Sequence, residues 1–249
     1  MIRLFVLFLL IASPLKAEEI VLGLSRDQVA ITATFEGSDI LVFGAIKREA
    51  PIAQDSNLGV IVTVVGPDQT IMVRRKDRRL GIWVNTDSVE VDAAPSFYAV
   101  ASSGPMKEVL RDIEDLRYRI TIPRVIRSVG SEIDDSAAFS QALVRIRAGN
   151  ELYQVLEGEV DLEQDTLFRT AITLPANLIE GEYEAHIFLT RDGVVIDEYI
   201  TLIPVRKVGL ERWLYNLAHE NALLYGLMSL SIAIAAGWLA SAAFSLLRR

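Results

Sequence analysis

The longest uncharged segment of the chain, Ala222 to Leu247, lies close to its C-terminus and most restricts what the chain can become. As a helix, its 26 residues would extend about 39 Å at 1.5 Å per residue. That length crosses the ~30 Å hydrocarbon layer of a membrane with some tilt, whereas a soluble core helix is seldom so long without a charge. We therefore predict one transmembrane helix over residues 222–247.

The residues that flank this span indicate how it lies in the membrane. Arg248 and Arg249 follow it, and positive charge favours the cytoplasmic side. Trp213, Tyr215 and Tyr225 lie at its other end, where aromatic side chains anchor helices at the membrane interface. We expect the two arginines, residues 248–249, to form a cytoplasmic tail and the three aromatic residues to be interfacial anchors.

The first 17 residues are typical of a secretory signal peptide. Arg3 precedes nine apolar residues, Leu4 to Ala12, and Ala17 offers a small residue for cleavage. The apolar run is too short to span a membrane as a helix, and a buried N-terminal strand is the alternative. Together with the C-terminal arginines, residues 1–17 predict a single-pass protein of a bacterial inner membrane, with the bulk of the chain in the periplasm.

Composition agrees with an exported bacterial protein. The chain has no cysteine and no Asn-x-Ser/Thr acceptor, so its exported part must be held together by a hydrophobic core. Removal of residues 1–17 takes away two of the 25 basic residues and none of the 33 acidic ones, which leaves a net charge of −10. Such a charge favours solubility and argues against nucleic acid as a partner.

Between residues 18 and 103 the hydrophobic pattern alternates with period two, and turn residues recur about every 8–12 positions. Seven or eight short strands in such a stretch are typical of a β-sandwich. We expect strands at residues 29–35, 40–46, 58–65, 70–75, 80–85, 88–91 and 96–101.

Residues 104–150 interrupt this pattern, and we expect two helices there. The first begins at Pro105, which suits the first helical position, and would bury one face formed by Val109, Ile113 and Leu116. The second covers residues 136–149 and ends at a glycine. This helical segment divides the β-rich sequence into two parts.

Residues 151–207 return to period two, and Asp192-Gly193 is the residue pair that two-residue hairpin turns favour. This segment either completes the sandwich or forms a second small Ig-like unit. Residues 208–221 predict an amphipathic helix at the membrane surface, with a plain helical connector as the alternative. The predicted fold class is therefore mainly β: an Ig-like β-sandwich with two short helices inserted, plus one C-terminal transmembrane helix.

The sequence contains no recognisable catalytic, metal or cofactor motif. His186 and His219 have no cysteine, second histidine or carboxylate at metal-ligand spacing. Gly-x-Ser-x-Gly, His-Glu-x-x-His and phosphate-binding glycine loops are absent from the sequence. We therefore expect a protein that is not an enzyme and that uses neither a metal nor a cofactor.

Five of the six residues from 74 to 79 are basic, in an acidic chain, and they lie at or beside an expected hairpin tip. One hypothesis is a contact for an anion, an acidic partner or lipid headgroups. The alternative is a solvated turn with an edge strand protected by charge. Trp83 follows in an alternating segment, and we expect it in the core, with an anchor for a ligand or partner as the alternative. The candidate contact residues are Arg74, Arg75, Lys76, Arg78 and Arg79.

Small residues recur at every fourth position of the predicted span. Such stripes let membrane helices pack closely and share hydroxyl hydrogen bonds. The stripe predicts a partner helix, from a second copy or from another integral membrane protein, with a plain anchor as the alternative. Its members are Ser229, Ala233, Gly237, Ser241 and Ser245.

Three segments, Val73 to Lys76, Gly81 to Asn85 and Phe97 to Ala99, together resemble the alphaproteobacterial family of putative transmembrane proteins of unknown function. The resemblance extends over most of the mature chain, including Gly181 to Tyr183 and the terminal span. It implies an envelope accessory of a transport system, with a sulfite-exporter-type permease as the partner. The predicted function is a non-enzymatic, membrane-anchored periplasmic accessory protein. The alternative is a periplasmic anion-binding module that uses residues 74–79.

Overall fold

The computed structural model describes residues 18–26, 28–32, 35–48, 57–126 and 136–247. The chain forms two compact units, one that ends at Val205 and excludes residues 30–35, and one that contains residues 30–35 and everything from Arg206 onward. The predicted signal peptide (1–17) and cytoplasmic tail (248–249) lie outside the described residues.

The first sheet has four antiparallel strands. Successive side chains point to opposite faces of the sheet, so the buried apolar residues, which alternate with exposed ones, form its inner face. In β3, for example, Ile40 and Val42 are fully buried while Leu41 and Phe43 are exposed. In order across the sheet, the strands are β1 (Glu18–Leu24), β3 (Ser38–Arg48), β10 (Leu167–Leu174) and β9 (Asp161–Glu163).

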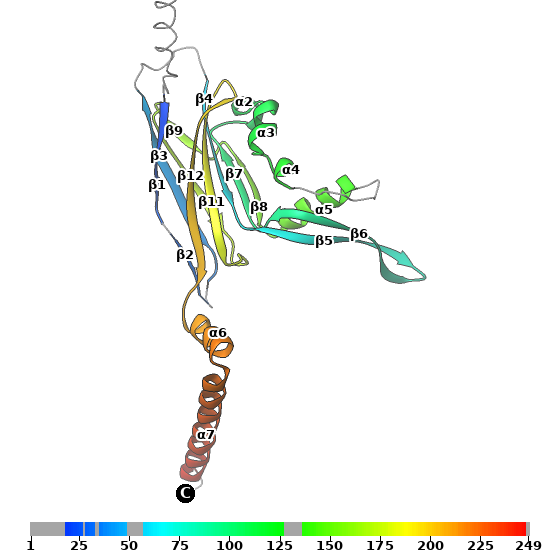
Figure 1. Ribbon diagram of the computed structural model, residues 1–249, viewed down its shortest axis with the longest axis vertical. Helices are drawn as coiled ribbons and strands as arrows, with labels where there is room; N and C mark the ends of the chain where they lie inside the picture. Colours follow the sequence, from blue (N-terminus) through cyan, green and yellow to red (C-terminus); the bar gives the residue numbers. More distant parts are fainter. Residues whose placement is uncertain (1–17, 27, 33–34, 49–56, 127–135, 248–249) are drawn as a thin grey trace, which may run out of the picture. The chain divides into compact units, whose positions relative to one another are not determined.

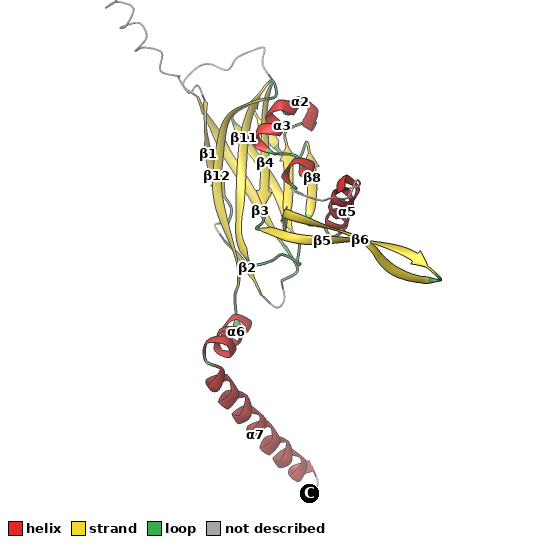
Figure 2. Ribbon diagram, turned by 45° about the vertical axis from the view of Figure 1, so that its right-hand side comes forward, coloured by secondary structure: helices red, strands yellow, loops and turns green. Residues whose placement is uncertain are grey.

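The second sheet has six strands, and Figures 1 and 2 show the two sheets packed face to face. Its central strand β4 is buried on both faces, because the first sheet covers one face and helices cover the other. In order across the sheet, the strands are β2 (Val29–Ile31), β12 (Val194–Lys207), β11 (Gly181–Arg191), β4 (Leu58–Val65), β7 (Tyr98–Ser102) and β8 (Tyr153–Glu157).

The prediction of a mainly β chain with one apolar C-terminal helix is confirmed. The strands of residues 151–207 enter both sheets, β9 and β10 the first and β8, β11 and β12 the second. The strand expected at 29–35 is shorter than predicted, since β2 ends at Ile31.

The helical segment connects β7 to β8 along the chain, and the direction of these two strands explains why. These two strands are parallel neighbours, and a parallel pair needs a long crossover connection rather than a hairpin. Residues 103–152 supply that crossover. It contains α2 (Met106–Val109), α3 (Asp112–Tyr118), α4 (Ile122–Val125) and α5 (Ser136–Gly149).

The first expected helix is broken in two, which corrects the predicted apolar face. Leu110 and Arg111 adopt extended conformations, because the Arg111 N–H donates to the carbonyl of Gly193 (2.9 Å) at the β11–β12 turn. Because of this break, the residues of α3 do not continue the buried face of α2. Val109 is buried as predicted, but Ile113 and Leu116 are exposed.

The segment from Asp68 to Pro95 does not enter the sandwich. Three sandwich strands were expected between residues 70 and 91, but the chain forms a separate two-stranded sheet, β5 (Asp68–Arg79) and β6 (Ile82–Pro95). This antiparallel hairpin, the arm, projects from the sandwich in both views (Figures 1 and 2).

The C-terminal unit contains two helices, α6 (Leu210–Glu220) and α7 (Ala222–Leu247), separated at Asn221. The bounds of α7 are those predicted for the transmembrane helix. Residues 222–242 are long and apolar enough to cross a membrane, and none of their side chains is buried against the chain itself. An apolar helix exposed in this way is stable in lipid rather than in water.

Candidate functional site

The base of the arm is held by a small hydrophobic core of its own. Val73, Val89 and Val91 of the arm pack with Phe139 and Leu143 of α5. Alternate arm residues face the helix because side chains alternate along a strand, so this arm face is buried only near its base.

Two arginines add to this attachment. The guanidinium of Arg75 lies 4.7 Å from the centre of the Phe139 ring, a cation–π contact. Arg147 of α5 donates to the Ser96 carbonyl and to Gln69 Oε1, both at 3.0 Å. These contacts tie the base of the arm to α5.

Beyond Arg75 the arm leaves the helix. A register shift follows Arg75, and every residue from Lys76 to Asn85 is exposed or half-buried. The outer part of the arm, residues 76–85, thus has no hydrophobic core.

The tip of the arm is apolar and exposed. Leu80 is fully exposed, Ile82 is 64% exposed and Trp83 is 68% exposed. The prediction that Trp83 lies in the core is therefore wrong, because the alternating pattern around it belongs to a hairpin with no second layer. Leu80 and Gly81 form the turn, with φ of 52° and 87°.

The five predicted basic residues lie on two faces of the arm. The register places Arg78 opposite Trp83, and residues opposite each other in an antiparallel pair share a face. Alternation puts Arg74 and Lys76 on that face too, and no described residue gives the side chains of these three a hydrogen bond or an ion pair.

The other two basic residues have partners. Besides its contact with Phe139, Arg75 Nη1 lies 4.0 Å from Asp87 Oδ2, and Arg79 Nε lies 3.9 Å from Asp77 Oδ2. The structure therefore brings the five together in one arm but leaves only Arg74, Lys76 and Arg78 without such a contact among the described residues.

A groove of about 460 Å³ lies between β5 and α5. Residues 73–76 line one side, and the other side includes Gln141 and Arg145. Sequence reasoning missed Arg145 and Phe139 as parts of this basic site, since they are more than 60 residues away along the chain.

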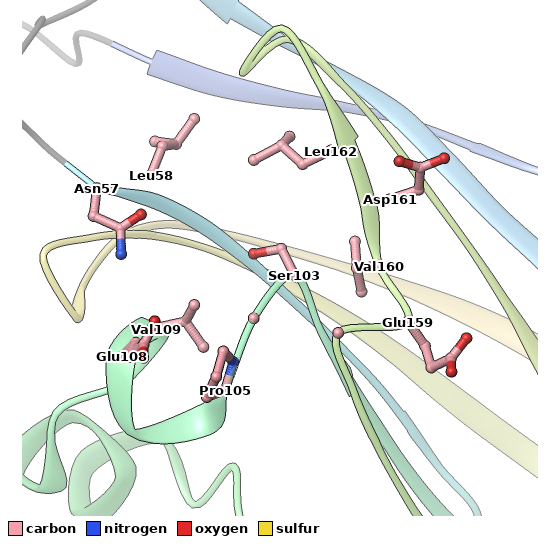
Figure 3. A pocket seen from close by; sticks show the side chains of 12 residues that line it. Asn57, Leu58, Ser103, Pro105, Glu108, Val109, Glu159, Val160, Asp161 and Leu162 are labelled. Carbon is pink, nitrogen blue, oxygen red and sulfur yellow. The ribbon is translucent and has the colours of Figure 1, made fainter.

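A hollow of about 690 Å³ lies where β4 begins, beside α2 and the turn before β9 (Figure 3). Its acidic side chains are Glu108, Glu159 and Asp161. Asp161 is held by Arg169 (2.8 Å), and Ser103 Oγ accepts a hydrogen bond from the Val60 N–H (3.0 Å). Asp161 and Ser103 therefore already have partners within the fold.

His186 lies between two glutamates on neighbouring strands. Its Nδ1 is 3.1 Å from Glu198 Oε1, its Nε2 is 3.2 Å from Glu184 Oε2, and its ring stacks on Phe188. Sequence spacing missed Glu198, because it reaches His186 across the β11–β12 pair. In the part of the chain that the structure describes, no group of three His, Cys, Asp or Glu side chains is arranged to hold a metal.

In the C-terminal unit, the stripe and the aromatic residues are exposed. Ser229, Ala233, Gly237 and Ser241 recur along α7, and Gly237 has open space around its Cα. The side chain of Ser245 lies outside the described residues. Trp213, Tyr215 and Tyr225 are also exposed, and the Tyr215 ring stacks on His219 at 4.0 Å.

A β-rich body with a projecting arm, followed in sequence by one candidate transmembrane helix among the described residues, is the arrangement of a membrane-anchored protein. A model of the family described as Putative transmembrane protein (Alph_Pro_TM) matches residues 19–246, and the chain belongs to this family. The resemblance seen in the sequence is thereby confirmed.

No protein of curated function matches the chain. Among solved structures, it is similar to Spo0M, a sporulation control protein from Bacillus subtilis, at 12% sequence identity and a TM-score of 0.30. The match covers 83% of this chain and 56% of the Spo0M chain, so this chain spans about half the length of that protein.

Proposed function

We propose that this protein is a non-enzymatic, membrane-anchored interaction protein of a bacterial envelope. In this proposal the β-rich body lies in the periplasm, α7 crosses the inner membrane, and the protein is an accessory of a membrane-embedded partner such as a permease. The observation that carries the proposal is the arm. The fold braces its base with α5 and leaves residues 76–85 unpacked, which is costly unless another molecule contacts them.

The stripe on α7 supplies the second contact of this proposal. Small residues let helix backbones approach closely, so one face of α7 suits a partner helix better than the opposite face does. Ser241 is on the stripe, and Leu239, two residues away, points to the opposite side because successive helical residues turn by about 100°.

Site-specific photo-crosslinking in native membranes tests the proposal. The full chain carries the photoreactive residue at Asn85 in the arm, at Ser241 on the stripe or at Leu239 as the matched control. We expect one discrete protein adduct from Ser241 that Leu239 does not give, and an adduct with the same protein from Asn85. Equal adducts from both faces of α7, or none from either Asn85 or Ser241, would overturn the proposal.

A second candidate function, anion binding, is favoured by the groove between β5 and α5. It brings Arg75 and Arg145 together from elements far apart in sequence, and guanidinium groups bind oxyanions through charged hydrogen bonds. Thermal unfolding of the full chain with inorganic phosphate tests this candidate. We expect phosphate to raise the midpoint, Arg145→Gln to abolish the rise, and Arg117→Gln on α3 to preserve it. An unchanged rise in Arg145→Gln rejects the groove as the site.

A further inference from the structure

Two hairpin turns of this protein have similar positive φ angles at both loop residues but carry different side chains. Asp192 and Gly193 join β11 to β12 with φ of 50° and 78°, and Leu80 and Gly81 join β5 to β6 with φ of 52° and 87°. In both cases the residues on either side of the two-residue loop are paired. Type I′ turns, which need positive φ at both central positions, favour Asn-Gly and Asp-Gly.

Leu80 is therefore an unfavourable residue in its turn. Its Cβ crowds the backbone at positive φ, where Asp and Asn are better tolerated. Its side chain is also fully exposed, so burial within the chain gives no compensation. Asp192 shows that the same turn is available with a residue that suits both the backbone and water.

The apolar surface surrounds the tip instead of covering one side. Ile82 pairs with Arg79 on one face of the hairpin, and Trp83 pairs with Arg78 on the other. Leu80 lies at the apex between them. A protein pocket contacts such a hairpin mainly through one face, whereas a bilayer surrounds all the side chains that enter it.

Positive charge lies directly behind this apolar tip. Arg78 and Arg79 are two and one residues before Leu80, within about 7 Å at ~3.4 Å per residue. The headgroup layer of a leaflet is about 5–7 Å deep. Lys76 and Arg74 follow farther back on the Trp83 face, so apolar and basic layers along the arm match the acyl and headgroup layers of a membrane.

We propose that the tip of the arm, Leu80 to Trp83, inserts into the surface of a bilayer that contains anionic phospholipids. The three apolar side chains enter the acyl boundary, where Trp is enriched. Arg78, Arg79 and Lys76 contact the phosphate groups. This membrane contact is additional to α7 and goes beyond the protein partner proposed above, which is tested at Asn85, behind the tip of the same arm.

A fluorescent reporter at the tip tests the insertion. The chain has no cysteine, so Ile82→Cys accepts a single environment-sensitive dye in the full chain. Val194→Cys, which occupies the same position in the matched turn, is the control probe. The protein is held through α7 in nanodiscs of phosphatidylcholine alone or mixed with phosphatidylglycerol, and vesicles of either composition are then added.

We expect the emission of the dye at position 82 to shift to the blue and to be quenched by spin-labelled lipid when phosphatidylglycerol is present in the nanodisc or in the added vesicles. The dye at position 194 should show neither effect. High salt should reverse the effect, because it screens the arginines from the headgroups. No shift in either arrangement overturns the proposal, and an equal shift in pure phosphatidylcholine rejects the anionic preference. A protein crosslinked at the tip in native membranes, with no lipid quenching, assigns the surface to a protein instead.

Two variants separate binding from folding. Leu80→Asn gives the turn its favoured residue, so we expect an equal or higher unfolding temperature and an affinity for anionic vesicles at least tenfold lower. Trp83→Gln leaves the turn unchanged and should weaken binding similarly. Arg78→Gln should lower the affinity for anionic vesicles about fivefold at low salt, whereas Arg117→Gln on α3 should leave that affinity unchanged. Wild-type binding by both Leu80→Asn and Trp83→Gln contradicts insertion.

Discussion

At the scale of single residues, the buried carboxylate of Glu18 joins three strands. Glu18 Oε1 accepts hydrogen bonds from Arg48 Nε and Arg191 Nη2, both at 2.7 Å. Arg48 also donates to Thr166 Oγ1 (3.2 Å) and to the carbonyl of Asp165. Because Glu18 and Arg48 belong to the first sheet and Arg191 to the second, this ion pair fixes how the two sheets meet at one end.

The Glu18 cluster predicts a large effect for Arg48→Met. Loss of one partner of a buried ion pair leaves charge without compensation, so we expect a loss of roughly 2–4 kcal/mol in the free energy of unfolding, reduced by the 29% exposure of the Arg191 side chain. Lys47→Met is the matched control. Lys47 pairs with Glu19 at 3.7 Å on the surface, and its loss should cost less than about 1 kcal/mol. Urea unfolding of both variants measures the difference, and equal losses would contradict the cluster's role.

Three buried tyrosines predict how stability depends on alkaline pH. Burial raises the pKa of Tyr153 to about 12, and burial also raises the pKa of Tyr98 and Tyr183 above the usual value of 10. As pH rises, the unfolded chain releases these protons first. Their contribution to stability is therefore fully present below pH 10 and is lost as pH rises from 10 toward 12.

The variant Tyr98→Phe tests this dependence. It should cost about 1 kcal/mol at neutral pH, because the Tyr98 hydroxyl donates to the Ile120 carbonyl at 2.6 Å. It should also make the loss of stability above pH 10 less steep, since one group no longer titrates. Urea midpoints measured across this range are the readout. An unchanged slope would show that Tyr98 does not titrate in the unfolding transition.

At the scale of elements, we expect the arm and α5 to open together, because they share one small core. The core cluster at the base of the arm contains only residues of β5, β6 and α5, with Ile126 packed at its side. The sandwich has its own core between the two sheets. Local opening of the arm can therefore occur without opening the sandwich.

Phe139→Ala tests this separation. Removal of a buried phenylalanine costs roughly 3–5 kcal/mol, and here it also removes the ring under Arg75. We expect faster amide hydrogen exchange in β5, β6 and α5, with β4 and β11 still protected. Ile146→Ala, at an exposed position of the same helix, should change exchange little. Equal acceleration in β4 would show that the arm and the sandwich unfold together.

At the scale of the whole molecule, α7 is the helix among the described residues that is long and apolar enough to cross a membrane, and the large part of the chain that precedes it contains the β-rich body. The proposed orientation puts the large part in the periplasm. The arm and any cytoplasmic tail would then meet different solutions, which makes the orientation measurable.

Cysteine labelling tests the proposed orientation. The natural chain has no cysteine, so each variant carries a single reactive thiol. Asn85→Cys in the arm should react with a membrane-impermeant maleimide once the outer membrane is permeabilised. A cysteine added after Arg249 should react only after the inner membrane is broken. The opposite pattern would reverse the orientation and place the body in the cytoplasm.

Local features of the sequence determined the elements that depend on one continuous segment. The bounds of α7 follow from 26 uncharged residues, and the β11–β12 turn follows from Asp192-Gly193, because length, charge and turn chemistry act within a few residues. The sequence also predicted that the five basic residues lie together at a hairpin, since all five fall within one run of six residues.

Only the tertiary structure decided what each apolar face packs against. An alternating pattern shows that one face of a strand is buried, but Val73 and Val89 have the same pattern whether they meet a sheet or α5. The break at Arg111 depends on a carbonyl of Gly193, and the partners of Glu18 are 30 and 173 residues away. Trp83 is exposed because no distant segment among the described residues packs against its face of the arm. Contacts between distant segments choose the partner of each face, and periodicity along the chain carries no information about that choice.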